Sequence, residues 1–351
     1  MKPLLASIVV LSFNQLEKTT RPCIESIYRH TDPEKFELIV VDNASEDGAP
    51  QYLRGLMAEH DNIKICLNKT NRGYAGGNND GMKLAEGKYI ALLNNDTLAT
   101  PGWLEQLTDI LAKNPGTGLL SPITNYAGNE QCVELPGITE KNYCEVARVY
   151  THRRRNSLFE TEKVGFFCVA MPSWVPERIG FLDEAFGMGL FEDDDYCLRV
   201  KNDLGLSVCV TEGCFIFHKG SSSFKKLDPA RYQALFDRNR KYFCEKHNIQ
   251  WRFGDIAEAF LAKLEKDIES YETGGSEKSR HIESIRVRLT HFRNAIFQLK
   301  HFETDFISMN SQGAAEAEFQ GDHWRLRGKL TRRLGKIRKS IDRKLAGIFR
   351  K

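Results

Sequence analysis

The sequence has no uninterrupted apolar run of about 18 residues, the length that a helix needs to cross a membrane. It has no signal peptide at its start, because Met1-Lys2-Pro3 leads directly into residues 4–11, an apolar run typical of a buried strand. Its nine cysteines are scattered without a C-x-x-C pair, which argues against a zinc ribbon and against a disulfide framework. Together these absences predict a cytoplasmic protein.

Charge is nearly balanced over the whole chain but not along it. The net charge is +3, yet residues 324–351 contain 12 Lys or Arg and one Asp. The rest of the chain therefore carries about −8. A basic segment can bind nucleic acid, but the body of the chain has no zinc finger or RNA-binding signature. Nucleic acid is therefore not an expected partner.

Strand-like and helix-like segments alternate over the first 120 or so residues. Short apolar runs predict strands at residues 7–11, 37–41, 63–67 and 89–93. Apolar residues at helical spacing predict helices at residues 16–30, 49–60, 76–85 and 101–113. This order predicts an α/β fold with a mostly parallel, doubly wound sheet, in which ligands bind beyond the carboxyl ends of the strands.

The later part of the chain is expected to be a loop first and helical at the end. A loop is expected at 121–163, a strand at 164–171, a helix at 191–204, short strands at 207–210 and 214–218, and helices after 229. The last helices suggest a hairpin that could mediate homo-oligomerisation or cover the first domain. We therefore divide the chain into a domain at 1–228, a helical extension at 229–312 and a basic tail at 313–351.

Polar residues follow the second and third predicted strands. The second strand ends in Asp42-Asn43, where a carboxylate could bind a nucleotide base or ribose, or could cap the next helix. The third is followed by residues 71–79, whose three glycines would let the backbone approach a ligand closely. Arg72 adds a fixed positive charge there, and a plain flexible turn is the alternative.

Carboxylates and a histidine mark three further places. Asp96 follows the fourth strand and could hold Mg²⁺ or Mn²⁺ against a diphosphate, or could cap a helix. Residues 192–195 are four adjacent carboxylates, whose mutual repulsion raises at least one pKa and suits a general base. A surface cluster at a helix N-terminus is the alternative. His218 ends another apolar run and is either a metal ligand or a core histidine.

Taken together, these segments resemble the family-two inverting glycosyltransferases of the GT-A fold. The resemblance covers roughly residues 5–225 and is greatest to bacterial members that build rhamnose- or galactofuranose-containing polysaccharides. The segments that resemble the family's motifs are residues 7–14, 41–45, 71–79, 93–97, 179–184, 191–199 and 218–222. Asn94 stands where the family often has a first Asp, which leaves Asp96 as the sole carboxylate expected on the metal.

The resemblance implies the role of each site residue. Asp193 would be the general base, and Asp96 and His218 would hold Mn²⁺ or Mg²⁺. The implied donor-binding residues are Ser12, Asn14, Asp42, Arg72, Gly73, Gly77, Asn78, Asn95 and Glu192. The implied reaction transfers a hexosyl- or pentosyl-type sugar from a UDP- or dTDP-sugar to a hydroxyl of a glycan or lipid-linked acceptor in bacterial surface polysaccharide synthesis.

Two other classes of protein fit the sequence less well. Sugar-1-phosphate nucleotidyltransferases need a loop with Gly, Arg and Lys after the first strand, and residues 12–15 offer none of these. A catalytically inactive GT-A domain that binds nucleic acid or membrane is the second alternative. The presence of Asp96, Asp193 and His218 argues against it.

The basic tail has the pattern of a helix that lies on a membrane surface. Its apolar residues recur every three or four positions, at Leu326, Leu330, Leu334, Ile337, Ile341, Leu345 and Ile348. Lys and Arg occupy the other faces, which suits peripheral attachment to an anionic membrane on its cytoplasmic side. The alternatives are a helix folded onto the acidic body or paired in a coiled coil.

We expect the full chain to co-sediment with anionic liposomes at low salt and a chain truncated after Gln320 to stay in solution. The expected difference follows from the loss of the apolar face and of the positive charge. Equal sedimentation of both chains, or of neither, would contradict membrane binding by the tail.

Overall fold

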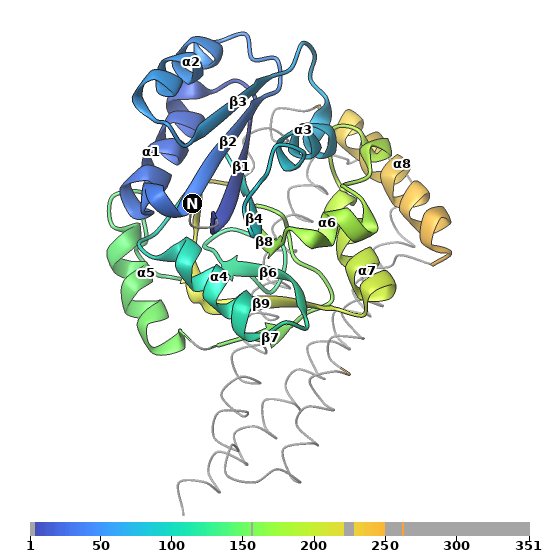
Figure 1. Cartoon of the computed structure of the whole chain (residues 1–351). Coiled ribbons are helices and arrows are strands. Elements are labelled where there is room, and N and C mark those ends of the chain that lie inside the picture. Colours follow the sequence, from blue (N-terminus) through green and yellow to red (C-terminus); the bar gives the residue numbers. More distant parts are fainter. Residues whose placement is uncertain (1–3, 156, 221–227, 250–261, 263–351) are drawn as a thin grey trace, which may run out of the picture. The chain divides into compact units, whose positions relative to one another are not determined.

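The computed structural model describes residues 4–155, 157–220, 228–249 and 262. The chain forms two compact units, and the first, Met1–Ala127 with Gln131–Lys246, contains both sheets (Figure 1). Of the expected helical extension, the structure describes helix α8 (Pro229–His247) and residues 248, 249 and 262, and the basic tail lies outside the described residues. The three-part division of the chain therefore stays a prediction.

The first unit is built on an eight-stranded sheet with the order β3-β2-β1-β4-β8-β6-β9-β7. The strands β3, β2, β1 and β4 are parallel, as are β6 and β9, whereas β8 is antiparallel to both of its neighbours and β7 to β9. The strands of this sheet are β1 (Ala6–Ser12), β2 (Phe36–Asp42), β3 (Ile63–Leu67), β4 (Tyr89–Asn94), β6 (Thr117–Ile123), β7 (Phe159–Glu160), β8 (Cys168–Pro172) and β9 (Ser207–Phe215). The prediction of a mostly parallel α/β sheet is confirmed.

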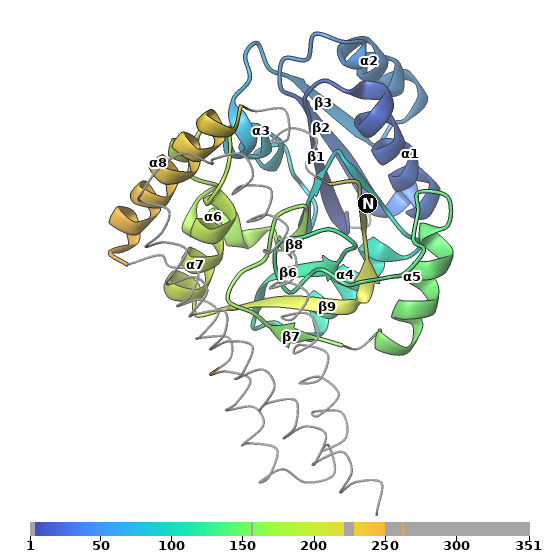
Figure 2. The ribbon, with the colours of Figure 1, turned by 180° about the vertical axis from the view of Figure 1, so that it is seen from behind.

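Helices cover both faces of the sheet (Figures 1 and 2). The first four α-helices follow the strands much as the alternation predicts, at α1 (Arg21–His30), α2 (Ala49–Glu59), α3 (Gly73–Met82) and α4 (Trp103–Lys113). The later ones are α5 (Tyr143–Thr151), α6 (Trp174–Ile179), α7 (Glu192–Leu204) and α8. Figures 1 and 2 both show α8 beside α6 and α7.

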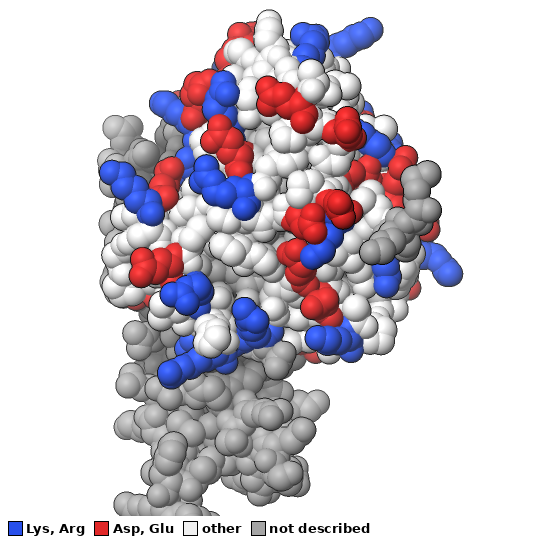
Figure 3. All heavy atoms as spheres, turned by 60° about the vertical axis from the view of Figure 1, so that its left-hand side comes forward, with Lys and Arg blue, Asp and Glu red and all other residues white. Residues whose placement is uncertain are grey.

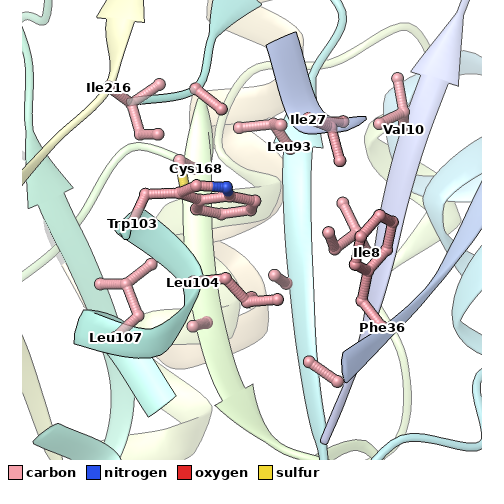
Figure 4. Packing of buried hydrophobic residues seen from close by; sticks show 14 of the residues in the cluster. Ile8, Val10, Ile27, Phe36, Leu93, Trp103, Leu104, Leu107, Cys168 and Ile216 are labelled. Carbon is pink, nitrogen blue, oxygen red and sulfur yellow. The ribbon is translucent and has the colours of Figure 1, made fainter. Parts of the chain in front are cut away.

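Alternating side chains of the strands supply two separate hydrophobic cores. Because successive strand residues point to opposite faces, Ile8 and Val10 of β1 join one core and Val9 joins the other. Figure 4 shows Trp103 and Leu104 of α4 in the first core. The second core contains residues of α3, α6 and α7, among them Met82, Val175 and Tyr196.

The prediction of a loop at residues 121–163 is wrong. This segment contains the end of β6, helix α5 and strand β7. Strand β6 is buried at every position although it contains Thr117 and Ser121, and the Ser121 hydroxyl donates a hydrogen bond to the carbonyl of Cys168. Polar residues satisfied inside a buried strand interrupt the apolar run by which a strand is recognised.

Other elements begin or end elsewhere than expected. The helix expected at 16–30 starts with a π-helical turn, Leu16–Thr20, before α1. The helix expected at 76–85 is α3, which begins at Gly73, and the strand expected at 164–171 is β8, which begins at Cys168. The two short strands expected at 207–210 and 214–218 are one strand, β9, followed by β10 (Phe217–His218), which pairs with β5 (Thr97–Leu98).

Charges of both signs lie side by side on the face shown in Figure 3. Exposed pairs such as Arg21–Glu17, at 2.8 Å, and Lys35–Glu105, at 3.3 Å, contribute little stability because water screens them. The first unit is therefore held together mainly by its two cores. Within the described part of the chain, we find no helix with the length and apolar character needed to span a membrane.

Candidate active site

The carboxyl ends of β1, β2 and β4 meet at one edge of the sheet. Ser12 is paired with Asp42 across β1 and β2, and Leu11 is paired with Asn94 across β1 and β4. Ser12 and Asp42, which are predicted to bind the donor, are therefore neighbours. Asn95 and Asp96 follow directly after β4 at the same edge.

Asp42 combines burial with an unsatisfied oxygen. Its side chain is almost wholly buried, and its Oδ2 accepts a hydrogen bond of 2.9 Å from the backbone N–H of Ser45. Its Oδ1 is buried without a hydrogen-bond partner among the described residues. A buried carboxylate oxygen without a donor is costly, so this atom suits a ligand that donates a hydrogen bond. Asp42 does not cap helix α2, whose N-cap is Gly48.

The loops after β1, β2 and β4 are tied together by short polar side chains. The backbone N–H of Asn14 donates to Ser45 Oγ at 2.8 Å, and Asn14 Oδ1 accepts from the N–H of Glu46 at 2.9 Å. Thr20 Oγ1 lies 3.0 Å from Ser12 Oγ and accepts from Asn95 Nδ2 at 2.9 Å. These bonds hold Asn14 against the loop after β2, and they join Ser12 to Asn95 through Thr20.

The glycine-rich segment packs closely against its neighbours. Gly73 has φ +70°, and a Cβ atom there would lie 2.0 Å from the carbonyl oxygen of Gly187. A Cβ atom on Gly77 would lie 2.3 Å from Leu11 Cδ1, so this glycine lets α3 approach β1. The amide of Asn78 is buried and donates to the carbonyl of Tyr74 at 3.0 Å.

Arg72 is already paired with two carboxylates. Its guanidinium lies 2.6 Å from Asp80 Oδ2 and 2.7 Å from Glu184 Oε2. Its charge is thus shared within the protein, and Arg72 links α3 to the segment before α7. The donor-binding roles predicted for Arg72, Gly73, Gly77 and Asn78 stay predictions.

Asp96 and His218 face each other. Asp96 Oδ1 lies 3.3 Å from His218 Nε2, and the two side chains are 10% and 11% exposed. His218 Nδ1 lies 2.8 Å from the carbonyl oxygen of Tyr126. Because a carbonyl oxygen only accepts hydrogen bonds, Nδ1 carries a proton. The bond from Nδ1 to this carbonyl holds the ring with Nε2 toward the carboxylate. Asp96 does not cap α4, whose N-cap is Gly102.

This pair fits a divalent cation that is shared with a substrate. A lone pair on Nε2 that faces a carboxylate oxygen is stabilised by a cation between them, and the bond from Nδ1 to a carbonyl is the usual support of a metal-bound histidine. Among the described residues, no group of three or more His, Cys, Asp or Glu could hold a metal. Mg²⁺ sites often use only one or two protein carboxylates, because substrate phosphates complete the coordination.

The four carboxylates at the start of α7 have different surroundings. Glu192 and Asp195 are buried, which rules out a surface cluster. Asp195 accepts hydrogen bonds from Arg199 at 2.9 Å and pairs with Lys246 at 2.6 Å, and Asp194 pairs with Lys163 at 2.7 Å. Glu192 Oε2 has no partner among the described residues. The cluster thus contains two neutralised carboxylates and two that are not.

The pKa values follow these surroundings. Burial and, to a smaller extent, the charge of Asp194 raise the pKa of Asp193 to about 6, and the charge of Lys163 opposes the rise. Burial and the charge of Asp193 raise the pKa of Glu192 well above its ordinary value. Asp193 is half-buried, so its carboxylate can still reach a substrate. A carboxylate with a pKa near neutrality is suited to accept a proton at physiological pH.

Tyr74 lies within electrostatic reach of carboxylates from two parts of the chain. Its hydroxyl donates to the carbonyl of Phe166 at 2.7 Å. Burial raises the pKa of Tyr74 well above its ordinary value, and the charges of Glu192, Asp193 and, less strongly, Asp96 raise it further. Carboxylates after β4 and at the start of α7, which are far apart in the sequence, therefore both act on Tyr74.

Sequence reasoning missed several residues that support this site. Lys163 pairs with Asp194, Lys246 pairs with Asp195, and Asn239 donates to the carbonyls before α7. The ring of Phe167 stacks on His218 with centroids 5.3 Å apart. Each lies in a segment without a motif, so no local pattern could have identified it.

The fold and the arrangement of the site indicate the structural class of this protein. A sheet that is mostly parallel, with polar loops at the carboxyl ends of its strands and carboxylates gathered there, is the nucleotide-binding GT-A architecture. The solved structure of GalNAc-T7 with UDP, GalNAc and Mn²⁺ shares this fold, with a TM-score of 0.50 and 13% sequence identity. The match covers 71% of this chain and 55% of that chain.

The comparisons of sequence identify the family. Residues 7–171 match the family model described as glycosyl transferase family 2. An uncharacterised glycosyltransferase of Methanocaldococcus jannaschii is 32% identical over 119 residues, which cover 34% of this chain and 41% of the relative. A UDP-Glc:alpha-D-GlcNAc-diphosphoundecaprenol beta-1,3-glucosyltransferase of Escherichia coli is 32% identical over 114 residues, which cover 32% of this chain and 44% of the relative. The chain thus spans less than half the length of these relatives.

This chain therefore carries a family-2 glycosyltransferase domain of the GT-A fold. The predicted family, family 2, and the predicted GT-A fold are confirmed. The match begins in β1 and ends in β8, so it includes Asp42 and Asp96. It does not extend to Asp193 or His218, whose predicted roles stay predictions.

We expect Asp193→Asn to raise the free energy of unfolding by about 1–2 kcal/mol at pH 7.5. The folded-state pKa of about 6 lies above the ordinary value of 3.8, so the charged carboxylate destabilises the folded protein. This effect is full above about pH 6 and disappears as the pH falls to about 4. Urea denaturation at both pH values measures it.

Asp203→Asn is the control, because Asp203 is an exposed residue of the same helix. It should change stability by less than about 0.5 kcal/mol at either pH. An Asp193→Asn variant no more stable than the wild type at pH 7.5 would contradict the raised pKa.

Proposed function

We propose that this chain is an inverting glycosyltransferase that moves a sugar from a UDP- or dTDP-sugar to a hydroxyl of a glycan or lipid-linked acceptor. The observation that carries the proposal is the position of Asp193. Its carboxylate, with a pKa of about 6, and that of Asp96, which faces His218, both act electrostatically on Tyr74. Together with Asp42, these are the groups needed for a donor, a leaving diphosphate and an acceptor.

The loops after β1 and β2 would hold the nucleoside of the donor. The unpartnered Asp42 Oδ1 would accept a hydrogen bond from a base N–H or a ribose hydroxyl. The bonds between Asn14, Ser45 and Glu46 hold this loop in place before the donor arrives. Less ordering is then required on binding, which favours affinity.

Asp96 and His218 would hold Mn²⁺ or Mg²⁺ against the diphosphate. Such a cation, when bound, neutralises charge on the leaving group. Tyr126 and Phe167 keep the imidazole of His218 in the orientation that turns Nε2 toward Asp96. Asn94 and Asn95 add no negative charge at this strand end, so Asp96 is the only carboxylate that the end of β4 contributes.

Asp193 would act as the general base. It accepts the proton of the acceptor hydroxyl while the oxygen of that hydroxyl attacks the anomeric carbon from the side opposite the diphosphate. The bond from the anomeric carbon to the diphosphate breaks in the same displacement, so the configuration at this carbon inverts. No covalent sugar–enzyme intermediate is needed, in contrast to a retaining glycosidase with its nucleophilic carboxylate.

The names of the relatives support the substrate classes. The relative from Escherichia coli is named for transfer from UDP-Glc to a diphosphoundecaprenol-linked sugar, and GalNAc-T7 was solved with UDP and Mn²⁺. These names favour a UDP-sugar and a lipid-linked acceptor for this chain, in bacterial surface polysaccharide synthesis. A lipid-linked acceptor would also explain a tail that attaches to an anionic membrane, which stays a prediction from the sequence.

We expect Asp193→Asn to lower the rate of sugar transfer about 100-fold or more and to leave nucleoside diphosphate affinity unchanged. The base acts on the acceptor in the transition state and has no part in binding the donor. In the wild type, transfer should fall as the pH decreases through about 6, because Asp193 then becomes protonated. Steady-state kinetics over about pH 5–8, which brackets the pKa of Asp193, measure the rate of transfer. Calorimetric titration with UDP and dTDP measures the affinity. Near-normal transfer by the variant would remove Asp193 from this role, and Asp203→Asn is the control.

We expect Asp96→Ala and His218→Ala each to weaken the binding of UDP or dTDP in the presence of Mn²⁺. Each variant removes one of two protein ligands of the cation, and a chelator should weaken the binding by the wild type in the same way. Calorimetric titration measures the affinities, and Asp109→Ala, at an exposed position on α4, is the control. Wild-type affinity that is equal in Mn²⁺ and in chelator would contradict the metal site.

A further inference from the structure

The segment before the proposed base has an unusual backbone. Gly187 and Gly189 have positive φ, and so do Leu190 and Phe191, with φ of 76° and 74°. The left-handed region is unfavourable for a residue with a Cβ atom, because this atom comes too close to the following carbonyl oxygen. Leu190 and Phe191 therefore keep this conformation only because other parts of the protein hold them in it.

Asn239 of α8 makes the contacts that hold this segment. Its side chain is fully buried, and its Nδ2 lies 2.9 Å from the carbonyl oxygen of Phe186, 2.8 Å from that of Gly189 and 3.0 Å from that of Leu190. Three carbonyls converge on one amide group that has two N–H bonds. The side-chain carbonyl of Asn239 accepts in turn from the Arg238 guanidinium at 2.8 Å, which fixes the orientation of the amide.

Other residues of α8 hold the two ends of the same segment. Lys246 Nζ lies 2.6 Å from Asp183 Oδ2 and 2.6 Å from Asp195 Oδ1. The hydroxyl of Tyr242 donates to Asp183 at 2.8 Å. The segment from 183 to 195 is thus attached to α8 at its start, its middle and its end, and the views of Figures 1 and 2 place α8 alongside α7.

We propose that Asn239 is a positioning residue, which sets the place of the Asp193 carboxylate by holding the left-handed turn at residues 186–191. The proposal rests on the proposed function of Asp193. Phe191 is the N-cap of α7, and its carbonyl accepts the N–H of Asp195 at 2.9 Å. The first turn of α7, which carries Asp193, therefore starts wherever this segment ends. Asn239 thus acts through this segment and not by contact with a substrate.

The matched test compares Asn239→Leu with Asn62→Leu. Asn62 also donates from Nδ2 to two backbone carbonyls, those of Pro33 at 3.2 Å and Phe36 at 3.0 Å. It precedes β3 and so lies at the amino end of the strands, away from the site. Both variants lose an amide of similar function, but only one of them loses the support of the base.

The probe is the hydrolysis of UDP- and dTDP-sugars with Mn²⁺, in which water takes the place of the acceptor hydroxyl. Turnover is divided by the number of nucleoside diphosphate sites found by calorimetric titration of the same sample. We expect Asn239→Leu to lower turnover per site by about 10- to 100-fold, because a displacement of about 1 Å is enough for such a loss. Asn62→Leu should leave turnover per site unchanged. A purely structural role of Asn239 would lower the number of sites and leave turnover per site unaltered.

Hydrogen exchange gives a second readout that does not depend on the activity. Amides of residues 186–195 should exchange faster in Asn239→Leu than in the wild type, while those of β1 and β4 stay unchanged. Equal exchange, or wild-type turnover per site, would overturn the positioning role. If Asn239→Leu does not fold, Asn239→Ala replaces it with the same expectations. A wild type that neither binds nor hydrolyses any of the nucleotide sugars would instead contradict the proposed function.

Discussion

The buried carboxylate of Asp195 is the point from which the candidate site is organised. It is fully buried and lies between Arg199 of its own helix and Lys246 of α8. Arg199 also donates to the carbonyls of Ile179 and Phe181, so one carboxylate joins α7, the chain after α6 and α8. Removing one partner of such a buried pair typically costs about 3–5 kcal/mol, because a charge is then left without compensation.

Neighbouring carboxylates acquire different properties because only some of them have a cationic partner. Asp194 and Asp195 are neutralised by lysine and arginine, whereas the buried Glu192 and the half-buried Asp193 beside them have no ion pair of their own among the described residues. The paired residues fix the helix, and the raised pKa of Asp193 suits the role of base that we propose for it. The same four residues thus supply both structural and chemical groups of the site. In other enzymes too, neighbouring carboxylates take different roles when their surroundings shift their pKa values apart.

The prediction of the fold succeeded where the local pattern of apolar residues indicates the type of element. Strands β1 to β4 were identified from their short apolar runs, and helices α1, α2 and α4 from apolar residues at helical spacing. Strand β6 was missed because Thr117 and Ser121 are buried in it, with the Ser121 hydroxyl satisfied by a distant strand. Helix α5 was also missed, although Tyr143 and Ala147 lie four residues apart on its buried face and were a usable signal.

The sequence by itself determined the family, the strand ends that carry Asp42 and Asp96, and the acidic run that begins α7, because these are local patterns of residue type and spacing. The tertiary structure alone decided which of these groups face one another. It placed His218 Nε2 against Asp96, gave Lys163 to Asp194, and brought Asn239 under the turn before Asp193. Such contacts join segments remote in the chain, and they form only when the two faces of the sheet are packed, so no local pattern contains them.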